Sequence, residues 1–363
     1  MNRFYSFFLV LIFLGSASLF ASSLIFNEEG HLIFPANTKV GTYRILGTLA
    51  KGAYSKVYKI KFDSNVSIDG QQAKEYAMKV SRHAPEYTSA LENEAYFLLK
   101  IRDKKKDTLY DELFVDLVEK FSFDVNSKRI FCLVLDLYPI NLSQYSSNPM
   151  TQYNLNLTQI LSKKIFLAVF FLSQNNIIHA DLKPENILVN SASKESCLDI
   201  KVCDFGLACT YSDSFSYPAL QTSWYRAPEV AQALNDYKKR KSDFCFDSQI
   251  DVWSIGCILY QFFTDNILFK ASKNDALLRM MLLFKSSSQE ALCCRLLSDI
   301  QSVKDIQAIK SEPSFFHFLN LLQNILIYNP QHRISPEEAL GHPFLSCFSS
   351  EEEPLEDPSK LGS

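Results

Sequence analysis

The chain has 363 residues and a mass of 41.5 kDa, which suits one large two-lobed enzyme or two ordinary domains. Hydrophobic residues make up 47% of it and charged residues 21%, so it can bury a core and is not intrinsically disordered. The net charge of −3 argues against a surface built to bind nucleic acid, and 10 Gly with 13 Pro exclude collagen-like and low-complexity chains.

The N-terminal segment 1–23 is apolar and has the features of a membrane-targeting sequence. Arg3 precedes a stretch without charge that runs from Phe4 to Asn27, and its most apolar part, Phe7–Leu14, is followed by small residues. A basic start, a short apolar run and small residues are typical of a secretory signal peptide. An uncleaved signal anchor is the alternative, because the uncharged stretch is long enough to span a bilayer. Either interpretation places the rest of the chain across a membrane.

The nine cysteines point to a different compartment. They are an odd number, form no Cys-x-x-Cys pair and have no spacing typical of a zinc site or a disulfide framework. We therefore interpret most of them as small buried hydrophobic residues, which fits a reducing compartment. Export into the cytosol of a host cell would reconcile that interpretation with a signal peptide. The localisation stays open between secreted or membrane-associated and cytoplasmic or nuclear.

Residues 24–42 are predicted to be a linker, and the following segment, 43–137, is predicted to be β-rich with one helix. Between the second and third expected strands, apolar residues recur at helical spacing from Leu91 to Leu99. The basic and acidic stretch Arg102–Asp107 that follows is predicted to be a solvated loop. Four apolar or alternating runs indicate the strands: Ser55–Phe62, Glu75–Ser81, Val115–Phe123 and Ile130–Leu137.

From Leu155 onward the apolar spacing is helical. A β-rich half followed by a helical half predicts an α+β fold with a small N-lobe (43–137) and a larger C-lobe (138–345). Residues 346–363, with Glu351-Glu352-Glu353, are predicted to form a flexible acidic tail. The expected helices are Leu155–Asn175, Ser248–Thr264, Asp275–Phe284 and Phe315–Tyr328.

Three short motifs in the second half carry most of the functional information. The first reads Ile178-His179-Ala180-Asp181-Leu182-Lys183-Pro184-Glu185-Asn186-Ile187-Leu188-Val189. Asp204-Phe205-Gly206 begins 18 residues after Asn186, and Tyr225-Arg226-Ala227-Pro228-Glu229 comes later. In this order and spacing the motifs resemble those of the eukaryotic protein-kinase family, and the resemblance covers residues 43–345. It implies the two-lobed protein kinase fold and transfer of a phosphoryl group from ATP.

The resemblance also assigns roles to the polar residues of these motifs. Asp181 would be the catalytic base, which orients the substrate hydroxyl and accepts its proton. Lys183 would reach the γ-phosphate, and Thr222 would bridge the base and the lysine, as in kinases that act on serine and threonine. Asn186 and Asp204 are the expected Mg²⁺ ligands, because Mg²⁺ prefers oxygen ligands and takes phosphate oxygens for the rest. The implied cofactors are ATP and Mg²⁺.

The residues that the resemblance assigns to ATP come from both halves of the domain. Lys79 would hold the α- and β-phosphates, paired with Glu94 of the following helix, and Glu92 is the competing partner. In the phosphate-covering loop only the middle glycine, Gly52, is kept, which predicts looser ATP binding. The full set is Leu49, Ala50, Gly52, Ser55, Val57, Ala77, Lys79 and Glu94, with Leu135, Asp136 and Tyr138 at the hinge.

Two further positions depart from the family pattern. Ala180 stands where the family usually has an arginine that gathers a phosphorylated residue of the activation segment, here Leu207–Ser223, so the chain is not expected to be switched by that route. Ser223 stands where one branch of the family carries another arginine. Three residues are assigned to the scaffold: Asp251 would hold the backbone of the catalytic loop, which carries Ala180 and Asp181, and Glu229 with Arg333 would fasten the activation segment.

The catalytic-loop sequence and Trp224–Glu229 look like the CMGC group, nearest to the DYRK-like and pre-mRNA-processing kinases. We therefore expect a Mg²⁺-dependent protein serine/threonine kinase, with tyrosine autophosphorylation left open. A pseudokinase that binds ATP or acts as a scaffold is the alternative, favoured by the reduced glycine loop and Ala180. A small-molecule kinase fits less well, because Ala227-Pro228-Glu229 and Thr222 belong to machinery for peptide substrates. Protein substrates are the expected partners, nucleic acid is not expected, a membrane is expected only through segment 1–23, and the chain is expected to be monomeric.

Overall fold

The protein divides into two compact units, Met1–Leu91 with Val118–Leu135 and Glu92–Leu117 with Asp136–Ser363. The predicted targeting segment 1–23 and the glutamates of the predicted tail lie outside the part of the chain that the structure describes, as does most of the helix expected at Asp275–Phe284. The computed structural model describes residues 24–63, 74–148, 151–190, 198–213, 220–237, 244–271, 274, 277–278, 288–300 and 306–346.

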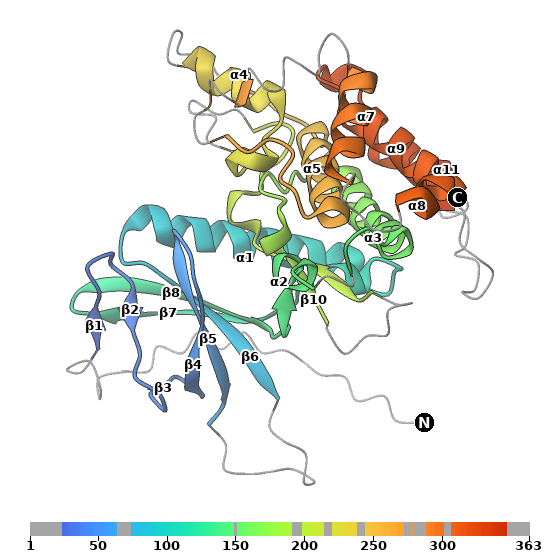
Figure 1. The fold of residues 1–363 in the computed structure, drawn as a ribbon. Coiled ribbons are helices and arrows are strands. Elements are labelled where there is room, and N and C mark those ends of the chain that lie inside the picture. The colour runs from blue at the N-terminus through green and yellow to red at the C-terminus, as the bar shows by residue number, and fades with distance from the viewer. Residues whose placement is uncertain are drawn as a thin grey trace. The chain divides into compact units, whose positions relative to one another are not determined.

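The first unit contains a six-stranded sheet with the strand order β3-β4-β5-β6-β8-β7 (Figure 1). Two of the strands expected from alternation, β5 and β6, have the bounds that the sequence predicts, and β7 and β8 lie within two residues of them. The bounds are β3 (Lys39–Val40), β4 (Tyr43–Lys51), β5 (Ser55–Phe62), β6 (Glu75–Ser81), β7 (Leu117–Val125) and β8 (Lys128–Asp136).

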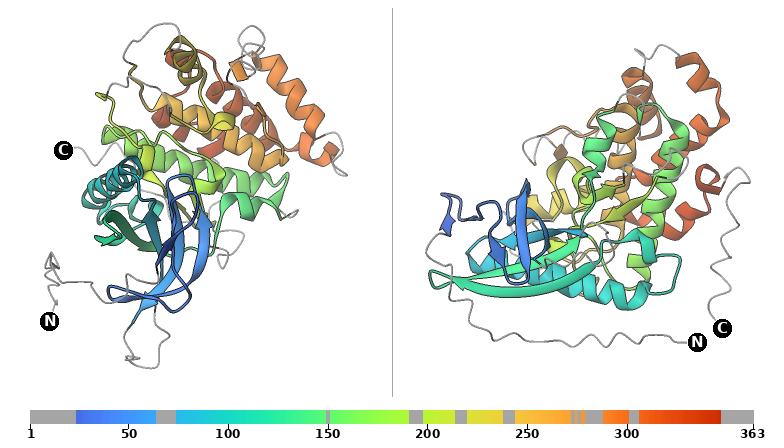
Figure 2. Two further views of the ribbon diagram at one scale, coloured as in Figure 1. Left: turned by 90° about the vertical axis from the view of Figure 1, so that its left-hand side faces the viewer. Right: turned by 90° about the horizontal axis from the view of Figure 1, so that it is seen from below.

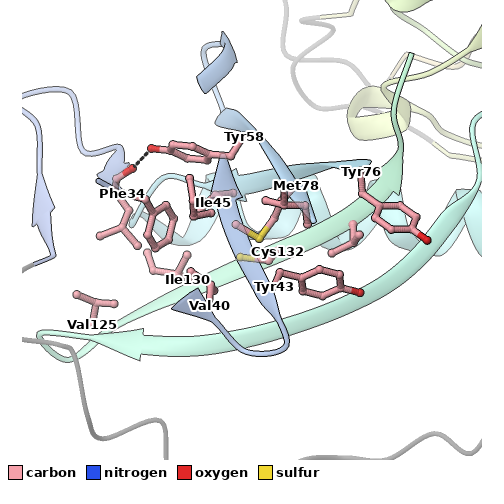
Figure 3. Packing of buried hydrophobic residues seen from close by; sticks show 14 residues of the cluster. Phe34, Val40, Tyr43, Ile45, Tyr58, Tyr76, Met78, Val125, Ile130 and Cys132 are labelled. Carbon is pink, nitrogen blue, oxygen red and sulfur yellow. Dashed lines mark hydrogen bonds between the residues drawn. The ribbon is translucent and has the colours of Figure 1, made fainter. Parts of the chain in front are cut away.

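The segment 24–42 is part of this unit and not a linker. It forms the antiparallel pair β1 (Ile25–Phe26) and β2 (Leu32–Ile33) before β3 begins. The Tyr58 hydroxyl of β5 donates a buried hydrogen bond of 2.6 Å to the carbonyl of Leu32, and Phe34 packs edge-to-face on the Tyr58 ring (Figure 3). Strands of two residues are too short to show alternation, so the sequence pattern could not indicate them.

The core of the first unit lies on one face of the sheet. Tyr43 and Ile45 of β4, Tyr58 of β5, Met78 of β6 and Cys132 of β8 are all buried and point into one cluster (Figure 3). Alternate residues of these strands supply it, because successive side chains of a strand point to opposite faces. Burying several aromatic side chains in one cluster contributes much of the stability of a small sheet domain.

The second unit is mainly helical and includes a three-stranded sheet of order β11-β10-β9. Its core helices α3, α5 and α9 pack against one another (Figure 2). The strands are β9 (Ile140–Asn141), β10 (Ile187–Val189) and β11 (Ile200–Val202). Besides part of α1 (Pro85–Lys105), the helices in the described residues of this unit are α2 (Leu142–Ser146), α3 (Leu155–Gln174), α4 (Pro228–Tyr237), α5 (Gln249–Thr264), α7 (Ser288–Asp299), α8 (Ile306–Ser311), α9 (Pro313–Ile325), α10 (Pro336–Leu340) and α11 (Pro343–Ser346). The single 3₁₀ turns are η2 (Asp111–Leu113), η4 (Pro184–Asn186), η5 (Phe205–Leu207), η6 (Ser223–Tyr225) and η7 (Pro330–His332).

Helix α3 is the central helix of this unit. The side chain of Asn154 accepts a hydrogen bond of 2.9 Å from the backbone N–H of Leu157 and so caps the first turn. Among the described residues, α3 alone is long and apolar enough to cross a membrane, but 67% of its apolar window is buried inside the fold. That burial is what the core helix of a folded domain shows.

Helix α1 (Pro85–Lys105) is longer than its apolar spacing predicts, and from Glu92 onward it belongs to the second unit. The stretch Arg102–Asp107 was predicted to be a solvated loop, and this is wrong. Most of the stretch forms the last turn of the helix, and Lys105 is only 1% exposed. A lysine is buried this deeply only when acidic groups pair with it. Those groups come from later in the chain, so the local sequence could not reveal them.

Candidate active site

The residues expected to bind Mg²⁺ lie at one end of the β10–β11 ladder. These strands pair antiparallel, with Ile187 opposite Val202. Asn186 directly precedes β10, and Asp204 comes two residues after β11. The backbone N–H of Cys203 donates a hydrogen bond of 3.0 Å to the carbonyl of Asn186, which continues the ladder by one step. The hairpin-like pairing therefore brings the two polar residues together from positions 18 apart in the chain.

The carboxylate of Asp181 is the centre of a closed hydrogen-bonded triangle. Its Oδ2 accepts a bond of 2.6 Å from Nζ of Lys183. Its Oδ1 accepts bonds of 2.9 Å from the backbone N–H and 2.8 Å from the hydroxyl of Thr222. Lys183 also donates to the Thr222 hydroxyl, at 3.2 Å. Asp181, Lys183 and Thr222 are thus oriented by one another, although they come from two loops that are 39 to 41 residues apart.

Asp251, in the first turn of α5, holds the backbone of the catalytic loop through its carboxylate. Its two carboxylate oxygens accept hydrogen bonds of 2.7 and 3.0 Å from the N–H groups of His179 and Ala180. Burial raises the pKa of Asp251 to about 7, and the two N–H donors oppose that rise. Ala180 has a positive φ of 61°, which costs energy in a residue other than glycine. Because both of its backbone groups are bonded, its carbonyl accepting from Gln221, the strained conformation is fixed.

His179 connects the catalytic loop to the segment that carries Asp204. Its Nδ1 accepts a hydrogen bond of 3.2 Å from the N–H of Asp181, and its Nε2 lies 2.9 Å from the carbonyl of Cys203. A carbonyl can only accept, so Nε2 carries the proton and the ring is neutral. Burial lowers the pKa of His179, which agrees with that assignment. The ring also packs on Phe205, at 4.8 Å between centroids.

The two expected metal ligands have the local chemistry that Mg²⁺ requires. The Asn186 side chain uses its NH₂ group to donate to the carbonyl of Asp181, at 2.9 Å. Its carbonyl oxygen accepts no hydrogen bond from any described residue, so that oxygen is available to a cation. Asp204 has a left-handed backbone (φ 64°, ψ 70°) that turns the chain sharply after β11. An amide oxygen and a carboxylate are hard ligands of the kind Mg²⁺ binds.

The end of the activation segment is fastened by an ion pair inside the second unit. Arg333 binds Glu229 through two hydrogen bonds, of 2.8 Å from Nη1 and 3.0 Å from Nη2. Its Nε donates to the carbonyl of Ile327, and its guanidinium lies over the ring of Trp253. The Arg333 side chain is completely buried, whereas that of Glu229 is 20% exposed. The pair therefore holds α4 against α5 and the loop before η7.

Sequence reasoning missed Gln221, which fixes the backbone beside Thr222. Its amide NH₂ donates to the carbonyl of Ile250 and to the hydroxyl of Ser254, at 2.8 and 2.9 Å. Its amide oxygen accepts from the N–H of Ala227, at 2.9 Å. A lone glutamine in a loop gives no pattern that would single it out, since the two partners of its NH₂ group lie in a helix that begins 28 residues later.

Most of the residues assigned to ATP lie in the first unit, on three neighbouring strands. The register places Ala50 opposite Val57, and Val57 opposite Lys79, so these three form one row across β4, β5 and β6. The N–H of Gly52 donates to the carbonyl of Ser55 at 2.9 Å and closes the turn between β4 and β5. Leu49 near the end of β4, Ala77 on β6 and Leu135 on β8 belong to the same sheet.

The remaining residues assigned to ATP lie in the second unit. The N–H of Asp136 donates to the carbonyl of Asp116 at 3.2 Å, and the ammonium group of Lys201 lies 5.9 Å from the centre of the Tyr138 ring. Glu94 is buried on α1. Lys79 is also buried, on β6 of the first unit, and its pairing with Glu94 stays a prediction.

Comparison with protein families decides what these motifs belong to. The protein kinase domain model matches residues 43–345. The chain belongs to the protein kinase family. The family accounts for the strand-rich first unit and the helical second unit, and for the positions of the three motifs along the chain.

Three relatives are similar to this kinase-family chain over nearly all of its length. It is 28% identical to the dual specificity protein kinase lkh1 of Schizosaccharomyces pombe, over 90% of this chain and 50% of the relative. It is 24% identical to the serine/threonine-protein kinase prpf4B of Dictyostelium discoideum, over 89% and 42%. It is 26% identical to the dual specificity tyrosine-phosphorylation-regulated kinase 2 of Drosophila melanogaster, over 89% and 43%. The chain therefore spans about half the length of these relatives.

Proposed function

We propose that this chain is an active protein serine/threonine kinase that uses ATP and Mg²⁺. The observation that carries the proposal is the triangle of Asp181, Lys183 and Thr222, in which a carboxylate, an ammonium group and a hydroxyl orient one another at 2.6–3.2 Å. Similarity to serine/threonine and dual specificity kinases supports it.

In the proposed reaction Asp181 orients the hydroxyl of a serine or threonine and accepts its proton at a carboxylate oxygen. General-base help of this kind contributes about 10²–10⁴-fold to the rate. Lys183 would stabilise the negative charge of the γ-phosphoryl group as its bond to ADP, the leaving group, breaks and its bond to the acceptor hydroxyl oxygen forms. Asn186 and Asp204 would hold Mg²⁺, which when bound neutralises charge on the phosphates. Thr222 keeps the base and the lysine in register, which favours serine and threonine over tyrosine as the acceptor.

The test compares wild type with Asp181→Asn in a phosphate-transfer assay with a general protein substrate. Residues 24–363 would be purified for it, and Asp265→Asn serves as the matched control, because Asp265 is exposed at the end of α5. We expect Asp181→Asn to lose at least about 100-fold in turnover, while the control stays near wild type. Equal phosphate incorporation by wild type and Asp181→Asn would contradict the proposal.

A pseudokinase is the second candidate, and the reduced glycine loop favours it. Ala50 and Ser55 carry Cβ atoms where the family pattern has glycine, so the loop has fewer accessible conformations. A shift of the unfolding temperature on adding Mg²⁺ and ATP, without turnover, would identify this candidate. The same shift in the presence of a chelator would show that binding does not need the metal.

We also propose that segment 1–23 targets the chain to a membrane and that the rest is monomeric. The supporting observation for targeting is the uncharged stretch that follows Arg3. Sequencing the N-terminus of the native protein tests cleavage, since an intact Met1 with membrane association would identify a signal anchor. Light scattering of the purified protein measures its oligomeric state.

A further inference from the structure

Asn93 connects helix α1 to the segment that follows Asp204. Its side-chain NH₂ group donates to the carbonyl of Gly206 at 3.2 Å and to the carbonyl of Ala208 at 2.9 Å. One amide therefore donates to two carbonyls of the η5 turn, those of its middle residue and of its C-cap residue. Asn93 directly precedes Glu94, so the connection is made on the helix at the residue next to the predicted partner of Lys79.

The other end of α1 is attached by charged groups. The buried ammonium of Lys105, in the last turn of the helix, lies 2.8 Å from Oδ1 of Asp116. Oδ2 of the same carboxylate lies 3.7 Å from the buried ammonium of Lys201, which also pairs with Glu112 at 3.1 Å. Lys201 is the central residue of β11. Burial alone would lower the pKa of Lys201, but its neighbours, including Asp116, favour the charged form and raise the pKa overall.

Both attachments end on one stretch of chain, residues 201–208, and Asp204 lies between their end points. On α1 the attachment points are 12 residues apart, which corresponds to about 18 Å of helix. A helix fixed at two points to the same segment can neither swing nor rotate away from it without breaking one attachment. The position of Asp204 is therefore tied to that of α1 by contacts already present in the folded chain.

The contacts at both attachments are made by amide, carbonyl, carboxylate and ammonium groups of the chain itself. At position 180, where a phosphate-gathering arginine would stand, there is a fully buried alanine. The backbone there is held by the carboxylate of Asp251 and by the N–H of Gln221. An amide that donates to two carbonyls, and ion pairs between ammonium and carboxylate groups, need no modification in order to form.

We propose that Asn93 is a positioning residue for Asp204, and that it acts with the Lys105–Asp116–Lys201 attachment to hold α1 in the competent position without phosphorylation of the activation segment. The inference rests on the proposed kinase function. Losing the two hydrogen bonds of Asn93 would leave the carbonyls of Gly206 and Ala208 without that partner, and the position of Asp204 would no longer be fixed. Because Asp204 is a proposed Mg²⁺ ligand, Mg²⁺-dependent nucleotide binding should weaken about tenfold.

The test uses Asn93→Leu, which keeps the size of the side chain but removes both donors. Asn93→Gln keeps the amide and should restore part of the effect, and Lys105→Met breaks the other attachment. Asn324→Leu is the matched control, because the Asn324 amide also donates twice, but only to Asn320 within its own helix α9. Each purified protein is measured with and without phosphatase treatment. The measurements are the Mg²⁺ dependence of nucleotide affinity, kcat, KM for ATP and for protein substrate, the unfolding temperature, and hydrogen exchange of residues 198–208.

We expect the wild type to keep its activity and the protection of residues 198–208 after phosphatase treatment. We expect Asn93→Leu to bind Mg²⁺ and nucleotide about tenfold more weakly and to exchange faster in 198–208, while its KM for protein substrate and its unfolding temperature match those of Asn324→Leu. Wild-type behaviour of Asn93→Leu, or loss of wild-type activity on dephosphorylation, would overturn the inference. A wild type without turnover would overturn the proposed function, and hydrogen exchange would then decide the attachment by itself.

Discussion

Replacing Glu229 by glutamine should strongly destabilise the second unit. In Glu229→Gln the Arg333 guanidinium keeps its charge and its completely buried position but loses the carboxylate that accepts from both terminal nitrogens. The new NH₂ group also faces an N–H donor. Removing one partner of a buried ion pair costs about 3–5 kcal/mol, because the other charge stays unpaired. For a unit of this size that corresponds to a fall in unfolding temperature of roughly 6–20 °C.

The assay is urea unfolding of the purified protein, followed by circular dichroism, with thermal unfolding as a second measurement. Glu337→Gln is the matched control, since Glu337 is exposed in the first turn of α10, and we expect it to stay within about 0.5 kcal/mol of wild type. A double variant with Arg333→Met should recover part of the loss, because no unpaired charge is left inside the unit. A loss below about 1 kcal/mol for Glu229→Gln, with an unchanged urea dependence, would refute this account of the pair.

Three further predictions concern packing, pH and thiol chemistry. Gly256→Ala should cost about 1–3 kcal/mol in unfolding free energy, since a Cβ there would lie 2.6 Å from the side chain of Ile325. Burial lowers the pKa of His342 in the folded protein below the ordinary histidine value of about 6.5. Below that pH the unfolded chain binds more protons than the folded protein, so stability falls as the pH drops through that range. His342→Gln should therefore lose less stability than wild type between pH 7 and 5, the difference being at most about 1.4 kcal/mol per pH unit in urea titrations; an identical slope would contradict this. Burial raises the pKa of the Cys132 thiol, so mass spectrometry after brief treatment with a thiol reagent should find the exposed Cys294 labelled and Cys132 unlabelled, and the reverse order would contradict the packing of β8.

The sequence predicted those strands of the fold in which apolar and polar side chains alternate. Strands β5 and β6 were predicted with their bounds because their side chains alternate over seven or eight residues. The burial of Lys105 could not be predicted, since its acidic partners Asp111 and Asp116 lie 6 and 11 residues further on, beyond the end of the helix. Asp116 also pairs with Lys201, which is 85 residues away from it in the chain. Interactions between residues far apart in the chain leave no periodic trace in the sequence.

The polar site was found from motifs, yet its geometry needed the structure. Spacing singled out Asp181, Lys183 and Asn186 because they are close in the chain. The bond between Thr222 and Asp181 crosses 41 residues, and only the folded loops bring the two together. Asn93 was not singled out at all, because an asparagine within a helix has no distinguishing neighbour pattern.

Both ring nitrogens of His179 are used in hydrogen bonds to the backbone, which affects how the pH dependence of this protein should be interpreted. Nδ1 accepts a hydrogen bond from a backbone N–H, and the N–H at Nε2 donates a hydrogen bond to a backbone carbonyl. The imidazole therefore has no ring nitrogen free to exchange a proton with a substrate, and its role is to link two loops. If the reaction rate changes with pH near neutrality, the group that titrates is therefore another one, such as the buried carboxyl of Asp251.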